Sequence, residues 1–376
     1  SDPMDRELRS GYTTGTCAAA AAQAAAWLLC RGETIERCSI PTGKGLAELP
    51  VSYLGETEKG VSFAVKKDAG DDPDVTDQAM ICAAVKKVER DPDPSWYASG
   101  DYPGIYIDGG KGVGRVTKPG LSCPVGKAAI NPVPREMIWK AVDQVRRAGE
   151  DPGSLLVTVE IPAGEELAEK TFNPKLGIVG GLSVLGTTGI VEPMSEAALT
   201  ATIRLEIHMK AVEGADYLVV TPGNYGEAFL KEHLGISLDQ GVKCSNFIRD
   251  TMKFMEEEGF RRGLLVGHAG KLIKAAGGVE NTHSRYGDRR MEILWDCVEG
   301  AVPPKAKDSR LREKILASNT TEEAVEYLEE EGIRRITGDF AAKRLRQQIL
   351  DWTDGKVDMD VILFSSGLGV FGEVGL

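Results

Sequence analysis

The chain has 376 residues, of which 42% are hydrophobic and 27% charged, which is typical of a soluble globular protein long enough for two domains. Its formal net charge of −12 disfavours partners such as nucleic acid or an anionic membrane surface. No apolar run approaches the roughly 20 residues of a membrane span and no signal peptide is recognisable, so we expect a cytoplasmic protein.

Cysteine and histidine usage disfavours a metal centre. The seven cysteines are an odd number without a Cys-x-x-Cys pair, so we predict reduced thiols rather than a disulfide framework. The four histidines show no spacing typical of metal ligands, and we therefore predict no protein-bound metal.

The first distinctive segment is a turn rich in glycine and threonine at residues 10–16, which runs directly into a series of alanines. Alanine is the best helix former, so we predict a helix at about 16–30, with Thr14 or Thr16 capping its first N–H groups. Two interpretations remain open. The helix N-terminus is either a seat for an anionic ligand, with Thr13 and Thr14 as candidate contacts, or a capped packing element.

Short apolar segments divided by glycines follow, and we predict strands at 35–40, 46–53 and 61–65. An acidic turn at residues 68–74 comes next. Its spacing is not that of a calcium loop, and we expect a solvated turn that caps a helix starting near Val75.

A predicted strand at 105–108 leads into residues 109–120, which include five glycines and three cations. Glycine allows close approach of a backbone to a ligand, and cations suit carboxylates or phosphates. The segment lacks P-loop spacing, and a plain hairpin with glycine turns remains the alternative. A helix that ends near Arg147 follows. The candidate anion-binding residues of this region are Lys111, Arg115, Lys118 and Lys127.

The pattern changes near residues 180–192. Before this region short strands dominate, the last at 155–161, and after it longer helices alternate with apolar strands. We therefore predict two domains, 5–182 and 183–376. The first is expected to be an α+β domain with short mixed or antiparallel strands, and the second an α/β Rossmann-like domain with a mainly parallel sheet.

The second domain contains two strand–turn–helix units. After a predicted helix at 193–212, an apolar strand at 218–220 meets the turn at 221–226, whose spacing is Gly-x-x-Gly rather than the full dinucleotide motif. A strand at 264–266 meets a second glycine turn at 267–270. Such turns present backbone N–H groups to ligands at the carboxyl ends of parallel strands. A turn that simply ends a strand remains the alternative.

The rest of the chain is mainly helical. Helices are predicted at about 245–258 and throughout 309–350, with a helix start at Thr320, before a last strand at 361–364. Residues 281–290 form the most polar compact segment. A solvated loop is one explanation. The candidate acid–base residues here, chosen by residue type alone, are His283 and Asp288.

Taken together and in order, these segments resemble one family, the CbiD proteins, which are cobalt-precorrin-5B C1-methyltransferases of anaerobic cobalamin biosynthesis. The resemblance spans nearly the whole chain, and the combination is more specific than any single motif. Departures lie in the helical tail after residue 300. The matching stretches are residues 11–20, 112–121, 129–134, 170–174, 181–191, 222–226 and 282–285.

The resemblance implies transfer of a methyl group from S-adenosyl-L-methionine to carbon 1 of cobalt-precorrin-5B, giving cobalt-precorrin-6A. Such a reaction requires in-line positioning and exclusion of water more than a protein nucleophile. On this basis the adenosyl cofactor is assigned to Thr221, Gly223, Asn224, Tyr225, Gly226 and Gly267. The polycarboxylate tetrapyrrole is assigned to the first domain's candidates together with Lys271, Lys274, Arg285, Arg289 and Arg290, because arginine pairs with carboxylates in a bidentate manner.

Two other functions remain open. A small-molecule kinase would use residues 109–120 as a phosphate loop and the acidic turn at 68–74 to hold magnesium for ATP. A tetrapyrrole carrier would bind the same macrocycle without catalysis. The sequence leaves the oligomeric state open, a homo-oligomer included.

Overall fold

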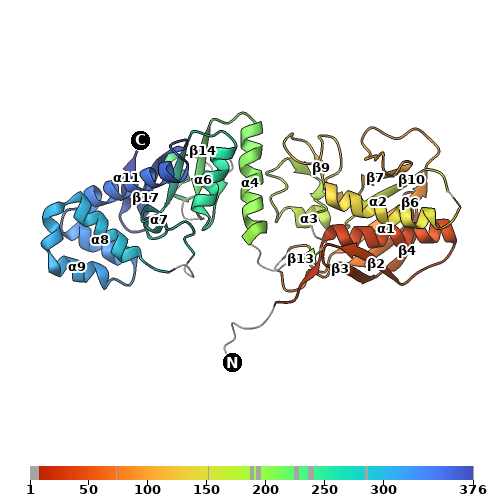
Figure 1. The fold of residues 1–376 in the computed structure, drawn as a ribbon, viewed down its shortest axis with the longest axis horizontal. Helices are drawn as coiled ribbons and strands as arrows, with labels where there is room; N and C mark the ends of the chain where they lie inside the picture. Colours follow the sequence, from red (N-terminus) through yellow and green to blue (C-terminus); the bar gives the residue numbers. More distant parts are fainter. Residues whose placement is uncertain are drawn as a thin grey trace, which may run out of the picture. The chain divides into compact units, whose positions relative to one another are not determined.

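The computed structural model describes residues 8–72, 74–150, 152–186, 190–191, 196–223, 228–235, 241–283 and 287–375. The chain divides into two compact units, Ser1–Ser195 and Glu196–Leu376 (Figure 1). Each unit mixes helices with a five-stranded sheet.

The first unit is built on a mixed sheet whose strand order is β4-β5-β6-β10-β7. Neighbouring strands are antiparallel except β10 and β7, which run parallel. The side chains of β10 from Leu155 to Val159 are buried, which is expected for a strand between two neighbours. The strands are β4 (Ser52–Thr57), β5 (Gly60–Lys66), β6 (Met80–Lys87), β7 (Ile105–Gly109) and β10 (Leu155–Glu160).

Helix α1 (Thr14–Arg31) packs against α2 (Pro132–Arg147) and against β5 and β6. Its alanines explain this packing, because those from Ala18 to Ala26 are fully buried and their small side chains allow close approach. The predicted cap was wrong. Thr13, not Thr14 or Thr16, precedes the helix, and its hydroxyl accepts the Thr16 N–H at 3.2 Å.

The helix expected to start near Val75 does not form. Residues 74–79 make turns and then enter strand β6, which is buried at the centre of the sheet. The acidic turn before it has a structural role. Asp74 accepts hydrogen bonds from the backbone N–H of Thr76 at 2.8 Å and from the buried Lys67 ammonium at 2.7 Å.

Small two-stranded sheets complete the first unit. In one of them β8 lies beside β12, and the backbones of Gly112, Gly164 and Gly181 almost touch. A Cβ on Gly112 would lie 1.6 Å from the carbonyl oxygen of Ile161. Several glycines of the predicted ligand ribbon therefore serve backbone packing. The remaining elements are β1 (Gly11–Tyr12), β2 (Arg37–Thr42), β3 (Gly45–Pro50), β8 (Gly112–Val113), β9 (Arg115–Val116), β11 (Ile178–Val179), β12 (Gly181–Leu182), β13 (Ile190–Val191) and α3 (Gly164–Ala168).

The second unit contains a sheet of order β15-β14-β16-β17-β18. The first four strands are parallel and β18 is antiparallel to β17. Strand β18 was not predicted from the sequence. The strands are β14 (Tyr217–Thr221), β15 (Val242–Lys243), β16 (Arg262–His268), β17 (Asp358–Ser365) and β18 (Gly369–Val374).

Both faces of this sheet are apolar. Leu265 and Leu363 belong to the large cluster packed against the helices, whereas Val266 and Phe364 belong to a smaller cluster that includes Phe229. The expected helix throughout 309–350 is interrupted twice. The helical elements are α4 (Glu196–Val212), α6 (Ile248–Glu257), α7 (Ala269–Ala276), α8 (Arg290–Ala301), α9 (Ser309–Leu316), α10 (Thr321–Glu330), α11 (Arg334–Trp352), η1 (Leu230–Leu234) and η4 (Pro303–Lys307).

Among the helices of the described residues, none is both long and apolar enough to cross a membrane.

Candidate functional site

The two glycine turns predicted from the sequence, at 221–226 and 267–270, begin at the carboxyl ends of the neighbouring strands β14 and β16. Among the strands of this sheet, β14 comes first in the chain and lies between β15 and β16. The chain therefore adds β15 on one side of β14 and the later strands on the other, which makes the end of β14 a topological switch point. Ligands of open parallel sheets bind at such a switch point, beyond the carboxyl ends of the strands. The candidate residues Asn224, Tyr225 and Gly226 lie outside the described residues.

The described part of the first turn is compact. Thr221 is fully buried, and its hydroxyl donates to the carbonyl of Gly223 at 3.3 Å. A Cβ on Gly223 would meet no atom of the described residues within 4 Å. Gly267 differs, since a Cβ there would lie 2.8 Å from Leu272 and 3.0 Å from Pro222. Its lack of a side chain lets the two turns pack together.

A hydrogen-bond network that sequence reasoning missed links the ends of β16 and β17. His268 accepts the Gly270 N–H at Nδ1 (3.0 Å), so its proton lies on Nε2, which donates to Glu322 Oε1 at 2.6 Å. The Glu322 carboxylate also accepts from the Ser365 hydroxyl (2.5 Å) and the Ser366 N–H (2.9 Å). One carboxylate therefore ties the start of α10 to two strand ends.

Burial opposes the charge of Glu322, but hydrogen bonds from Ser365, the Ser366 amide and His268 hold its pKa below the ordinary value. The predicted helix start at Thr320 is confirmed, because the Thr320 hydroxyl accepts the Glu323 N–H at 3.1 Å. No local pattern predicts that the neighbouring Glu322 contacts His268, since 54 residues separate them.

The first turn of α7 carries the candidate Lys271, which is half-buried. Its charge acts on Cys244, where burial raises the thiol pKa to about 12 while Lys271 opposes the shift. Lys274 is different. It is 8% exposed, burial lowers its pKa, and its ammonium donates to the carbonyl of Thr282 at 3.1 Å. Lys274 therefore anchors a loop through this contact. A residue that bound the carboxylates of the tetrapyrrole would instead direct its ammonium toward solvent.

That loop lies at the start of the polar segment 281–290, and Thr282 is held close to the same edge of the sheet. The Thr282 N–H donates to the carbonyl of Asn246, and the Cys244 N–H donates to Thr221. His283 follows as an exposed residue whose N–H donates to Asn281. Arg285 lies outside the described residues.

The end of the polar segment lines a hollow of about 680 Å³ beside α8 and α9. Asp288 pairs with Arg290 at 2.9 Å, and this contact holds the pKa of the carboxyl below its ordinary value. Asp288 is thus a carboxylate near neutral pH. Arg289 lies 3.4 Å from Glu292 at the same hollow, to which Arg312 also contributes.

Two of the four candidate cations of the first unit, Arg115 and Lys127, bind their own chain. The Arg115 guanidinium pairs with Asp108 at 3.0 Å and donates to the carbonyl of Gly109. The Lys127 ammonium donates to the carbonyls of Pro94 and Trp96. Both hold loops together.

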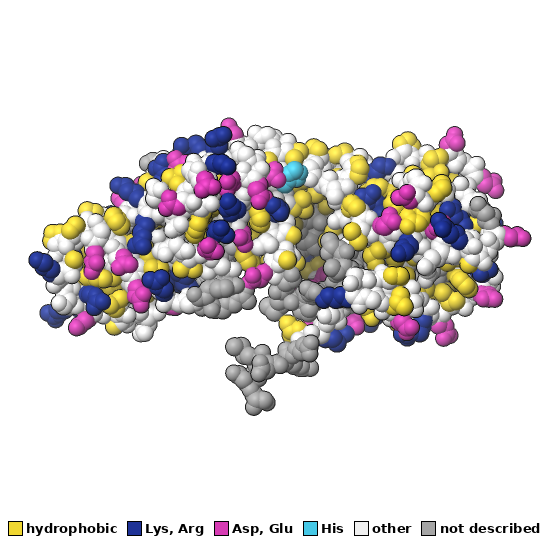
Figure 2. Space-filling model, in the orientation of Figure 1, with side chains coloured by type: hydrophobic (Ala, Val, Ile, Leu, Met, Phe, Trp, Pro, Cys, Tyr) yellow, Lys and Arg dark blue, Asp and Glu magenta, His cyan; other side chains and the backbone are white. Residues whose placement is uncertain are grey.

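Lys111 and Lys118 are exposed, and the stem of Lys118 lies against Gly177. In the turn at residues 10–16, Thr13 and Thr14 are 8% and 4% exposed, because they form the capped start of α1. On the face shown in Figure 2, cations and acids are interspersed on both units. Binding of an anion on this face therefore depends on local donors rather than on a field of one sign.

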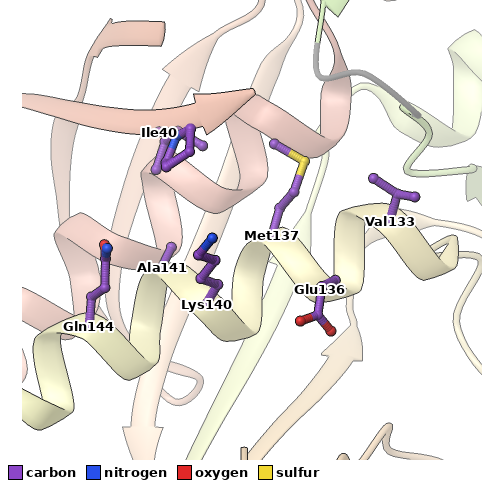
Figure 3. Close-up of a pocket in the computed structure, with 8 residues that line it drawn as sticks. Ile40, Val133, Glu136, Met137, Lys140, Ala141 and Gln144 are labelled. Carbon is purple, nitrogen blue, oxygen red and sulfur yellow. The ribbon is translucent and has the colours of Figure 1, made fainter. Parts of the chain in front are cut away.

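A smaller hollow of about 230 Å³ lies between β2 and α2 in the first unit. Ile40 faces a row of α2 side chains that includes Met137, Lys140 and Gln144 (Figure 3). None of the candidate residues lines this groove. Among the described residues, no group of three His, Cys, Asp or Glu side chains could hold a metal ion.

Comparisons with known proteins point to one family. The CbiD family matches residues 1–193, and the CbiD C-terminal domain family matches residues 281–375. A cobalt-precorrin-5B C(1)-methyltransferase of Ruminiclostridium cellulolyticum is 42% identical over 96% of this chain and 90% of its own length. The enzyme of the same name from a Thermoanaerobacter species is 40% identical over 98% of this chain and 96% of its own length.

One solved structure, the cobalamin biosynthesis protein CbiD from Archaeoglobus fulgidus, is 28% identical and covers 75% of this chain and 84% of that one, with a TM-score of 0.39. The family matches and the full-length relatives lead to one conclusion: the chain belongs to the CbiD family.

Proposed function

We propose that this protein transfers a methyl group from S-adenosylmethionine to carbon 1 of cobalt-precorrin-5B, a step in corrin-ring formation. The observation that carries the proposal is the pair of relatives named for this activity, which are at least 40% identical to this chain over nearly its whole length. The anaerobic product is cobalt-precorrin-6A, and the same relatives do not favour a kinase or a carrier.

The second domain, 183–376, is our proposed site for the methyl donor. The order β15-β14-β16-β17-β18 of its mainly parallel sheet, with a switch point at the end of β14, supports our assignment of a Rossmann-like fold. The N-terminus of α7 and the Lys271 side chain suit the carboxylate end of the donor. We retain Thr221, Gly223, Asn224, Tyr225, Gly226 and Gly267 as proposed contacts.

S-adenosylmethionine supplies an electrophilic methyl group when bound. The protein's task is to hold the acceptor carbon nearly in line, at about 3 to 3.5 Å, and to exclude water. Such a role needs rigid turns, and the hydrogen-bonded ends of β16 and β17 supply them. His283 and Asp288 remain our proposed residues for taking or holding a proton of the ring system.

The first domain, 5–182, is our proposed site for the tetrapyrrole, whose carboxylate arms call for cationic partners. Lys111 and Lys118 are exposed there, and Arg115 is partly exposed beside Asp108. Thr13, Thr14 and Lys127 complete the proposed set in this domain. From the second domain, Arg285 and Arg289 are retained as proposed tetrapyrrole contacts, whereas Lys271, first assigned to the tetrapyrrole, is reassigned to the donor.

The test is an anaerobic incubation of the protein with cobalt-precorrin-5B and S-adenosylmethionine labelled in its methyl group. We expect equal amounts of labelled tetrapyrrole and S-adenosylhomocysteine. Tetrapyrrole binding without S-adenosylhomocysteine would contradict the proposal and support a carrier. Tight binding of ATP–magnesium with no binding of S-adenosylmethionine would instead support a kinase.

A further inference from the structure

The start of α7 has a neighbour that none of the contacts above explains. Thr321, the first residue of α10, is 4% exposed, and its hydroxyl has no hydrogen-bond partner among the described residues. A buried hydroxyl without a partner costs free energy, so its presence calls for an explanation.

This hydroxyl lies against the first turn of α7. A Cβ on Gly270 would be 3.0 Å from Thr321 Oγ1 and 3.1 Å from His268 Nδ1. Gly270 therefore lets the hydroxyl approach the helix N-terminus closely. A helix leaves its first N–H groups without partners inside the helix, and here His268 takes that of Gly270.

The surroundings combine two helix N-termini with the carboxylate of Glu322. The first turns of α7 and α10 meet here, as the His268–Glu322 contact shows, and each helix N-terminus carries partial positive charge. Lys271 adds a full charge in the first turn of α7. The nearby Glu322 carboxylate already accepts hydrogen bonds from His268, Ser365 and Ser366, so it is directed toward the β17 turn and does not use the Thr321 hydroxyl.

The geometry points to a carboxylate-binding subsite formed by the N-terminus of α7, the Thr321 hydroxyl and Lys271. The subsite takes the amino-acid carboxylate of the methyl donor. This assignment rests on the proposed function, and it adds Thr321 as a specificity residue for the donor. The same subsite chemistry would also suit a carboxylate arm of the tetrapyrrole, and the test distinguishes the two ligands.

The test compares S-adenosylhomocysteine with 5′-methylthioadenosine, which has the same nucleoside but lacks the amino-acid end. Calorimetry is performed on the wild type, Thr321→Val and Lys271→Met. The control is Thr337→Val, because the Thr337 hydroxyl is also buried without a partner among the described residues but lies on α11.

Thr321→Val is expected to weaken S-adenosylhomocysteine binding about fivefold, the effect of one hydrogen bond. Lys271→Met is expected to weaken it about tenfold, the effect of a lost charged partner. Both should leave 5′-methylthioadenosine unaffected, and Thr337→Val should change neither ligand. The thermal midpoint of Thr321→Val should equal or exceed that of the wild type, because an unsatisfied hydroxyl is removed. A binding loss therefore cannot be ascribed to unfolding.

Unchanged S-adenosylhomocysteine binding by Thr321→Val would overturn the subsite, and so would an equal loss for both nucleosides. Cobalt uroporphyrin, a tetrapyrrole with eight carboxylates, is the third ligand tested. If Thr321→Val weakened this ligand alone, the carboxylate would belong to the tetrapyrrole and the donor assignment would be wrong. If the folded wild type bound neither nucleoside, the proposed function itself would fail.

Discussion

At the scale of single residues, the carboxylate of Glu322 is the best-connected group at the edge of the second sheet. It receives hydrogen bonds from an imidazole, a hydroxyl and a backbone amide that come from two different strand ends. A carboxylate can accept several donors at once, whereas an amide side chain must also donate. Replacing the carboxylate by the amide of glutamine therefore turns at least one of these attractive contacts into a repulsive one.

We expect Glu322→Gln to lower the free energy of unfolding by about 1 kcal/mol at neutral pH. The folded-state pKa of Glu322 lies below its ordinary value of 4.5, so its contribution is complete above that pH and is lost as the pH falls through the lower folded value. The difference between wild type and Glu322→Gln should therefore shrink below about pH 4.5. Urea unfolding at several pH values measures it.

Glu323→Gln is the matched control for this prediction. Glu323 also lies in the first turn of α10, where it accepts from the Asn319 N–H and the Tyr327 hydroxyl within its own segment. Both variants lose one negative charge at the same helix N-terminus. Only Glu322→Gln should weaken S-adenosylhomocysteine binding, and equal weakening by both variants would show that helix charge, rather than the strand-end network, sets the affinity.

At the scale of elements, the fold of α1 follows directly from composition. Its alanines were predicted to form a helix that packs closely, and the structure buries them against α2, β5 and β6. We expect Ala20→Leu to lower the free energy of unfolding by about 1–3 kcal/mol, because a fully buried position leaves no room for added carbons. Denaturant unfolding measures the change.

Ala197→Leu makes the same substitution at an exposed position of α4. Its effect should stay within about 0.5 kcal/mol. A similar loss for Ala20→Leu and Ala197→Leu would indicate that the packing of α1 tolerates larger side chains.

The acidic turn before β6 carries another prediction at this scale. Lys67→Met would leave the partly buried Asp74 carboxylate without its ammonium partner, and we expect a loss of about 3 kcal/mol in the free energy of unfolding. Thermal unfolding of Lys67→Met and of Lys67→Met with Asp74→Asn measures it. The double variant should recover part of the loss, because no charge remains buried. If it were no more stable than the single variant, charge burial would not be the cause.

Local patterns predicted elements well where one signal dominated, as in α1, β7 and β10. They failed where the environment decided. Residues 80–87 follow a turn with capping residues, yet their apolar side chains form a central strand because both neighbours pair with it. Strand β18 was missed since its glycines weaken any strand pattern, and one of them, Gly372, packs against the backbone of Gly338 in α11.

The candidate site likewise has parts that local sequence predicts and parts that it does not. Turns at the ends of β14 and β16 were predicted because glycine and the preceding apolar strand lie together in the chain. The roles of Arg115 and Lys127 in holding loops, and of Lys274 in anchoring Thr282, depend on partners that are distant in sequence or are backbone carbonyls. No side-chain pattern reveals a backbone partner.

At the scale of the whole molecule, we propose that the two compact units bind different ligands. The first contains the candidate cations of residues 109–127 beside closely packed glycine backbones, and the second contains turns at the edge of a mainly parallel sheet. Relatives that match nearly the full length contain both parts, in agreement with a reaction that needs two ligands. The division of labour between the units is testable without knowledge of how they are arranged.

We expect Gly223→Val and Arg115→Ala to fail differently. A side chain on Gly223 would hinder close approach of the donor to the backbone at the proposed site, so S-adenosylhomocysteine affinity should fall at least tenfold while cobalt uroporphyrin binding persists. Arg115→Ala should weaken cobalt uroporphyrin about tenfold and leave S-adenosylhomocysteine binding intact, because a charge-assisted contact is lost. Calorimetry with each ligand measures both.

Asp108→Asn separates the two roles of Arg115, since it removes the partner of the guanidinium and keeps the cation. If Arg115 binds an anionic ligand, Asp108→Asn should maintain or strengthen cobalt uroporphyrin binding, because a competing carboxylate is gone. If Arg115 only holds its loop, both variants should weaken binding alike. Loss of tetrapyrrole affinity alone in both Gly223→Val and Arg115→Ala would mean that the second unit does not hold the methyl donor.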